Sequence, residues 1–192
     1  MKLNKILGLV AVAALALMAF ASTASATTLE TNGVKQSGAV TLEATLSGSA
    51  ILKSTTGSFA NTCSESTVKG TTSVFTGTTA SGNVSSLTFE NCTHEAIVVN
   101  SKGNLSVERI GSTTNGTVRS SGASVLLEVT VLNFLVGTTC TTSNTDLGTL
   151  DGVSAGATKI TINANLTCSG LLPSANWAAT YVITGHAIGV TA

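Results

Sequence analysis

The chain has 192 residues, with 9 basic and 9 acidic side chains, and only 9% of its residues are charged. An average domain has about a quarter of its residues charged. The balanced charge and the lack of a Lys/Arg cluster argue against a nucleic-acid partner, because such proteins need a basic surface. The apolar share of 43% argues against a solvated disordered chain. The composition therefore indicates one compact domain.

Residues 1–26 have the layout of a secretory signal peptide. Two lysines precede an apolar run at residues 6–20, and small residues lead up to an expected cleavage point after Ala26. As a helix, about 15 apolar residues span about 22 Å, which is less than the ~30 Å hydrocarbon core of a membrane. We therefore expect a cleaved signal helix. The mature chain of residues 27–192 is then a single domain without a transmembrane anchor, secreted or associated with the cell envelope.

An alternation of apolar and polar residues with a period of two first occurs at residues 39–46, where Val40, Leu42 and Ala44 share one face. This period predicts a half-buried strand. Threonine is abundant throughout the mature chain, and its β-branched side chain packs well on a pleated sheet. No sustained helical period occurs after residue 26. The fold class expected is all-β, as an antiparallel β-sandwich or a barrel-like domain.

Short polar segments that contain glycine are expected to form the turns between strands, because glycine readily adopts positive φ. The predicted turns are Ser81-Gly82-Asn83, Ser101-Lys102-Gly103-Asn104, Thr114-Asn115-Gly116, Ser121-Gly122 and Asp151-Gly152. Their spacing is typical of a sandwich or barrel.

Residues 124–136 are apolar on both faces when read as one strand. Val125, Leu127 and Val129 fall on one face, while Leu126 and Phe134 fall on the other. Such a strand is either central to a two-layer core or in contact with something apolar.

Two further alternating segments lie near the carboxyl terminus. At residues 160–166, isoleucine, alanine and leucine alternate with threonine and asparagine. At residues 177–184, one face carries Trp177, Tyr181 and Ile183, which predicts an anchor for the core.

All four cysteines lie in the mature chain, and an even number in an exported protein favours disulfides. Three pairings are open. Cys63 and Cys92 are 29 positions apart, Cys140 and Cys168 are 28 apart, and the residues flanking the two pairs are similar. These spacings favour Cys63–Cys92 and Cys140–Cys168 as clips of two related hairpin-like units, residues 63–92 and 140–168.

The order of these landmarks resembles that of small secreted bacterial proteins, most of them hypothetical exported proteins of actinobacterial type. It is also distantly similar to a secreted group named for activating alkane oxidation. The landmarks that carry the resemblance are Cys63-x₄-Val68-x-Gly70-Thr71, Ser86-Leu87-Thr88-Phe89-x₂-Cys92, Gly137-x₂-Cys140, Leu147-Gly148-Thr149-Leu150 and Trp177-x₂-Thr180-Tyr181-x-Ile183. The resemblance implies an exported β-domain with paired disulfides and, through the second group, a connection with apolar compounds.

We expect no enzymatic activity. Nucleophilic hydrolysis needs a base beside the nucleophile, and the chain has only two histidines, His94 and His186, with no Gly-x-Ser-x-Gly motif. Glu95 follows His94, but neighbouring strand residues point to opposite faces. Glu128 is the carboxylate embedded in an apolar strand, and we expect it to face solvent or to pair with an arginine.

No cofactor or metal is expected either. No Cys-x-x-Cys motif occurs, and neither histidine has the spacing of a ligand to a cysteine pair. Asn144, Asp146 and Gly148 are spaced as in a calcium loop, but the third and twelfth ligands are missing.

Two functional hypotheses remain. The first, which the low charge and the Thr/Ser-rich composition favour, is a non-enzymatic structural role outside the cell through association with itself, a surface or the cell envelope. The second is a binding module for a small apolar ligand, a hydrocarbon or lipid. The expected contacts of such a ligand are Leu127, Val129, Phe134, Trp177 and Tyr181.

Overall fold

The structure is a computed structural model that describes residues 27–57, 59–94, 97–131, 134–152 and 157–192. The predicted signal peptide, residues 1–26, lies outside the described residues. The secondary structure of the described part is entirely β. Its strands are β1 (Thr28–Thr31), β2 (Val34–Lys35), β3 (Val40–Leu46), β4 (Ala50–Ser54), β5 (Ala60–Thr76), β6 (Thr79–Cys92), β7 (Val98–Arg109), β8 (Gly116–Val131), β9 (Phe134–Thr141), β10 (Thr145–Asp151), β11 (Lys159–Ser169), β12 (Ser174–Ile183) and β13 (Ile188–Thr191).

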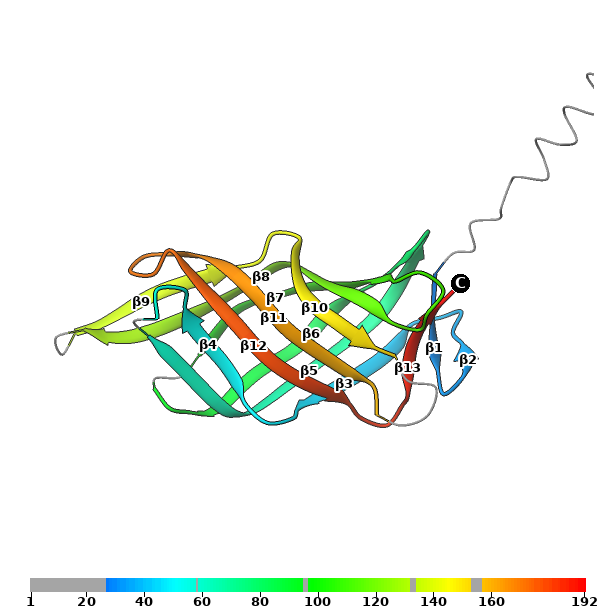
Figure 1. The fold of residues 1–192 in the computed structure, drawn as a ribbon, viewed down its shortest axis with the longest axis horizontal. Coiled ribbons are helices and arrows are strands. Elements are labelled where there is room, and N and C mark those ends of the chain that lie inside the picture. Colours follow the sequence, from blue (N-terminus) through cyan, green and yellow to red (C-terminus); the bar gives the residue numbers. More distant parts are fainter. Residues whose placement is uncertain (1–26, 58, 95–96, 132–133, 153–156) are drawn as a thin grey trace, which may run out of the picture.

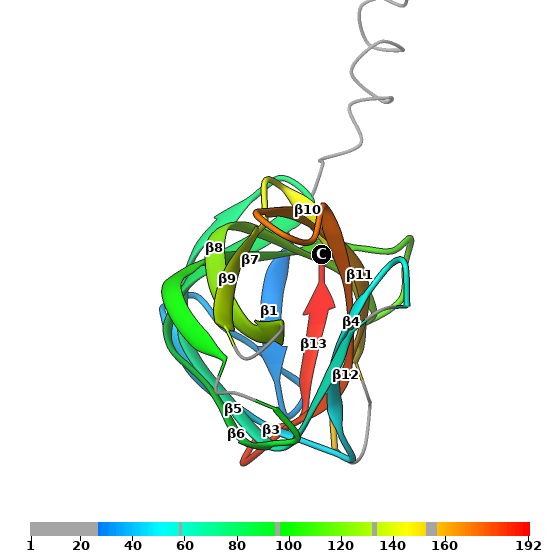
Figure 2. The same ribbon diagram turned by 90° about the vertical axis from the view of Figure 1, so that its left-hand side faces the viewer.

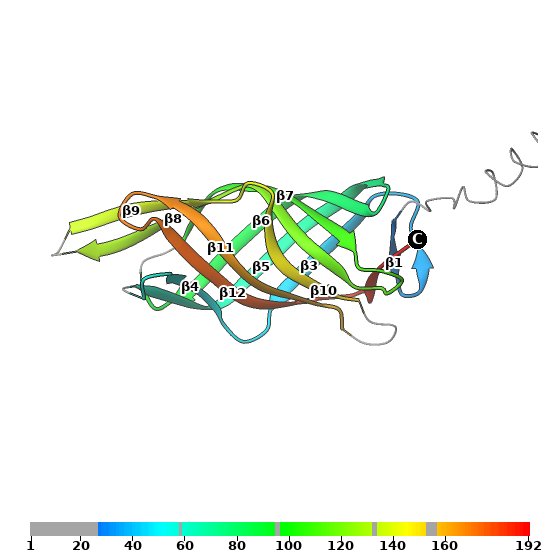
Figure 3. The same ribbon diagram turned by 45° about the horizontal axis from the view of Figure 1, so that its top comes forward.

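The main sheet closes on itself. From β5 to β8 each strand pairs antiparallel with the next in sequence, and β11 pairs with β12. β12 in turn pairs with β3 and β4, which pair with β5 and complete the ring. Figures 1 and 3 show the strands running obliquely around one long axis. Of the two predicted architectures, the barrel-like one is therefore correct.

At two positions in the ring, two short strands lie one after the other in place of a single long strand. β3 and β4 follow one another along β5 and β12, and β9 and β10 follow one another along β8 and β11. With this reading, the described part of the chain has eight strand positions in the ring, each beside its neighbour in sequence. Every strand can thus pair with the next one along the chain, apart from the single closure between first and last.

The predicted alternation separates an inner apolar face from an outer polar face. On β11, Ile162, Ala164 and Leu166 are buried, and the threonine and asparagine residues that alternate with them are exposed. On β12, Ala179, Tyr181 and Ile183 are buried, which confirms the predicted inner face of that strand. The hydrophobic core therefore lies inside the ring.

One end of the ring is covered by a plug, by which we mean the three-stranded sheet β13-β1-β2. In Figure 1 this sheet lies at one end of the long axis, and in Figure 2, viewed along that axis, β1 and β13 lie within the outline of the ring. Leu29, Ile188 and Val190 of the plug are almost completely buried. Thr158 fixes β13 by accepting from the Ile188 N–H (2.6 Å) and donating to the Ile188 carbonyl oxygen (2.9 Å).

The two disulfides join the predicted partners, Cys63 with Cys92 and Cys140 with Cys168. Each joins residues that face one another on neighbouring strands, β5 with β6 and β9 with β11. Each disulfide therefore clips two adjacent antiparallel strands, and both lie toward the end of the ring opposite the plug. Such bonds indicate an oxidising environment. The relation between residues 63–92 and 140–168 as two similar units stays a prediction.

Three of the predicted turns are wrong, because the segments lie inside long strands. Residues 81–83 belong to β6, residues 101–104 to β7 and residues 121–122 to β8. A Cβ on Gly82 would lie 2.4 Å from the carbonyl oxygen of Thr71, so glycine is needed there for close strand approach. Gly103 has a φ of 65°, as expected where a long strand bends around a closed sheet. The predicted turns at residues 114–116 and 151–152 are confirmed as strand boundaries.

The prediction of one doubly apolar strand at residues 124–136 is also wrong. β8 ends at Val131 and β9 begins at Phe134, and these two residues face one another in an antiparallel pair. The segment is a hairpin, so its apolar residues belong to two strands. Val125 and Leu127 are buried inside the ring.

Candidate ligand cavities inside the closed sheet

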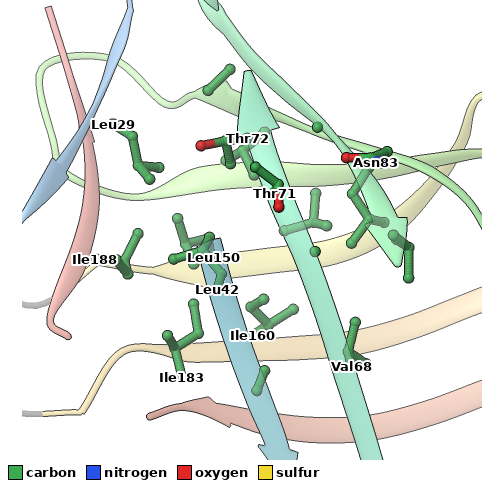
Figure 4. Close-up of a pocket in the computed structure, with 18 residues that line it drawn as sticks. Leu29, Leu42, Val68, Thr71, Thr72, Asn83, Leu150, Ile160, Ile183 and Ile188 are labelled. Atoms are coloured by element: carbon green, nitrogen blue, oxygen red, sulfur yellow. The ribbon is translucent and has the colours of Figure 1, made fainter. Parts of the chain in front are cut away.

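A cavity of about 90 Å³ lies inside the ring next to the plug. We call it the plug-end cavity. Its wall is almost wholly apolar and is built from residues of strands all around the ring, together with Leu29 and Ile188 of the plug. Figure 4 shows Leu42, Leu150, Ile160 and other side chains converging on it from different strands. A space of this kind inside a sheet is suited to apolar molecules.

Two further cavities continue this space along the interior. The middle cavity, about 60 Å³, shares Ala44, Val68 and Leu105 with the plug-end cavity. The disulfide-end cavity, about 30 Å³, has Cys140 in its wall and shares Trp177 with the middle cavity. Because neighbouring cavities share their walls, the three form a series that runs from the plug toward the disulfides.

Few polar groups border these cavities, and several of their side chains are hydrogen-bonded. The Tyr181 hydroxyl and Ser66 Oγ are hydrogen-bonded at 2.8 Å, and Ser66 Oγ donates to the Thr88 carbonyl oxygen at 2.6 Å. Ser120 Oγ and Thr142 Oγ1 form a hydrogen bond of 3.1 Å. Burial raises the pKa of Tyr181 to about 12, and the hydrogen bond with Ser66 acts in the opposite direction. The interior near Tyr181 is therefore a poor environment for charge.

The five predicted ligand contacts are distributed unevenly. Trp177 borders the middle and disulfide-end cavities, and Tyr181 borders the middle cavity. Leu127 is buried on β8 but does not line any of the three cavities. Val129 and Phe134 belong to β8 and β9, and their side chains lie outside the described part of the structure.

Most of the residues that line the cavities were not predicted as site residues. Leu42 and Ala44 were recognised as one face of a strand. Val68 was named only as a landmark of the resemblance, and Leu105 and Val118 were not assigned to any inward face. A local pattern identifies an inward face. Which inward faces meet around an open space depends on ring closure, so sequence alternation alone does not locate the cavities.

Those residues considered for catalysis that the structure describes lie on different elements and have separate contacts. His94 lies after β6, where its ring contacts Phe59 (centroids 5.5 Å apart), and Glu95 lies outside the described residues. His186 lies between β12 and β13, 3.5 Å from the Asn32 amide nitrogen. Glu128 faces Gly137 across the β8–β9 pair.

Of the three residues spaced as in a calcium loop, Asp146 is engaged in an ion pair. Its carboxylate lies 2.8 Å from Arg119, which also lies 3.8 Å from Glu108. Within the described residues, no group of three or more His, Cys, Asp and Glu side chains could hold a metal ion. The absence of enzymatic activity, metal and cofactor remains a prediction.

Comparison of the chain with protein-family models, curated proteins and solved structures gives no match. Among the described residues, no helix has the length and hydropathy needed to cross a membrane.

Proposed function

We propose that this protein is an exported, non-enzymatic binding protein that holds a small apolar ligand, a hydrocarbon or lipid, inside its closed sheet. The observation that supports this most directly is the series of apolar cavities between the plug and the disulfides. Apolar cavities of about 150 Å³ in other proteins stay dry and take up molecules such as benzene. Because the three cavities follow one another in a line, they favour a ligand with a slender chain over one with a compact ring system.

Export is supported by two features. The layout of residues 1–26 is that of a signal peptide, and both disulfides would be reduced in a reducing compartment. A ligand-binding protein outside the cell would meet hydrocarbons or lipids from the surroundings or from the cell envelope. The distant resemblance to the secreted alkane-associated group points to the same class of ligand.

A structural role through self-association or envelope contact stays a prediction, with weaker support. The argument for it relied on open sheet edges that could pair between copies. In the described part of the chain the main sheet closes, so it offers few such edges. Light scattering of the oxidised mature protein tests this role, and a monomer at high concentration would count against it.

The binding proposal is tested by titration with alkanes and fatty acids. The chain has one tryptophan, Trp177, and it borders two of the cavities, so we expect its fluorescence to change as ligand binds. Binding to the folded state should also raise the melting temperature. Unchanged fluorescence and unchanged melting temperature across the panel would overturn the proposal.

A cavity-filling variant separates binding inside the ring from binding on its surface. Ala44 borders both the plug-end and middle cavities, so Ala44→Leu fills space that a ligand needs. We expect about tenfold weaker binding and, because the added side chain fills empty space, no loss of thermal stability. Ala178→Leu is the matched control, because Ala178 lies on the outer face of β12. Equal binding by both variants would place the ligand outside the cavities.

A further inference from the structure

The side chain of Trp177 combines two features that occur together at no other described residue of the cavity walls. It belongs to the walls of both the middle and the disulfide-end cavity. Its Nε1 is shut off from solvent and has no hydrogen-bond partner. The other buried side-chain nitrogen and oxygen atoms without a partner, within the described residues, belong to residues that line none of the three cavities.

The indole ring is held in place by its aromatic neighbours. Phe89 and Tyr181 pack against it edge-on, with centroids 6.0 Å and 6.4 Å away and interplanar angles of 70° and 79°. The Tyr181 hydroxyl is already paired with Ser66. A fixed ring presents its N–H in one direction, and no nearby hydroxyl satisfies it.

A buried N–H without an acceptor is unfavourable, because folding removes the water that would otherwise bind it. An incoming ligand with an acceptor would restore the missing bond. On this basis, and resting on the proposed function, we propose that the ligand is an apolar chain bearing one neutral oxygen acceptor, as in a ketone, ester or ether, which accepts from Trp177 Nε1.

A neutral acceptor fits the cavity walls better than a charged one. Among the residues that the structure describes, Lys102 is the one charged residue that borders any of the three cavities, and it is exposed to solvent. A carboxylate inside would therefore lose its hydration without a buried cation to replace it. The raised pKa of Tyr181 agrees with an interior that disfavours negative charge.

The test compares nonane, 5-nonanone and nonanoate with the oxidised mature protein. Because the chain has a single tryptophan, a ¹⁵N-labelled sample gives one indole N–H resonance. We expect 5-nonanone to move that proton resonance downfield and nonane to leave it without such a shift. An unmoved resonance with bound ketone would overturn the proposal, and this readout needs no variant.

A second arm uses Trp177→Phe, which keeps an aromatic ring and removes the donor. Calorimetry should show that the substitution weakens 5-nonanone binding by about 2- to 12-fold more than nonane binding, which is the effect of one net hydrogen bond. Comparing the two ligands cancels the effect of the smaller ring. An equal change for both ligands would overturn the proposal.

The outcomes separate this proposal from the proposed function. Nonane binding without any ketone-specific effect overturns the acceptor and leaves apolar binding intact. Binding of neither nonane nor 5-nonanone overturns both. Selective binding of nonanoate that is lost in Lys102→Gln would show that a charged headgroup is recognised at the surface, which also overturns the neutral acceptor.

Discussion

The two ends of the closed sheet are held by different kinds of interaction. Toward one end, Cys63–Cys92 and Cys140–Cys168 link neighbouring strands covalently. At the other end, the plug is held by buried side chains and by hydrogen bonds such as those between Thr158 and Ile188. Non-covalent contacts open and close locally under native conditions, whereas a disulfide opens only by thiol exchange.

This difference has a consequence for the cavities. The largest one lies beneath the plug, and the smallest lies beside Cys140. The largest of the three cavities therefore lies at the end that is held by non-covalent contacts, and the smallest lies at the end with the disulfides. We expect the plug end to exchange with solvent first.

The largest predicted effect concerns the disulfides. Replacing Cys63 and Cys92 by alanine, or Cys140 and Cys168, should each lower the free energy of unfolding by about 2 to 5 kcal/mol, since each bond closes a long loop. Urea unfolding of the oxidised protein and of both pair variants measures this. The sequence separations of 29 and 28 residues are nearly equal, so the two losses should be similar. If removal of either cysteine pair left the urea midpoint unchanged, that disulfide would not stabilise its end of the ring.

The next effect concerns the plug. Ile188→Ala should lower the free energy of unfolding by about 2 to 5 kcal/mol, because Ile188 is almost fully buried. It should also speed amide hydrogen exchange in β1 and β13 more than in the ring. Leu166→Ala is the matched control, because Leu166 is buried on β11 beside the disulfide-end cavity. Equal acceleration throughout the sheet in both variants would show that the plug does not open as a separate unit.

Local sequence patterns predicted those parts of the fold that depend on neighbouring residues. The alternation at residues 160–166 specifies which side of β11 faces inward, whatever strand lies beside it. Three predicted glycine turns were wrong, because sequence alone does not distinguish a glycine in a turn from a glycine at a close contact between strands. Gly82 is needed because Thr71 of another strand lies opposite.

The candidate site was predictable only in part for the same reason. Trp177 and Tyr181 were predicted as apolar contacts because a large aromatic on an alternating face points into the interior. Val68 and Val118 join them only through ring closure, which brings β5 and β8 around one space. The unpaired Trp177 Nε1 depends on the absence of an acceptor on every neighbouring strand, and no sequence window contains that information.

The smallest predicted effect concerns the ionisation of Tyr181, which tests whether both ends of the ring keep water out of the interior. Burial raises the pKa of Tyr181 from 10.0 to about 12. The folded protein holds the phenol neutral where the unfolded chain ionises it, so this stabilisation is complete below pH 10 and is lost as the pH rises to 12. The loss is about 3 kcal/mol, because the pKa differs by about two units between the folded and the unfolded chain. Because the chain has a single tyrosine, tyrosinate absorbance follows its ionisation directly, and Tyr181→Phe should remove this part of the pH dependence.

The same titration shows which end admits water. In Ile188→Ala, a loosened plug should bring the pKa of Tyr181 back toward 10, because hydration of the phenolate weakens the effect of burial. In the protein lacking the Cys140–Cys168 bond, the strands around the disulfide-end cavity still pair, so the pKa should stay raised while the protein is folded. The opposite pattern would mean that the covalent end, rather than the plug, controls access to the interior. An ordinary pKa in the unmodified folded protein would mean that neither end excludes water.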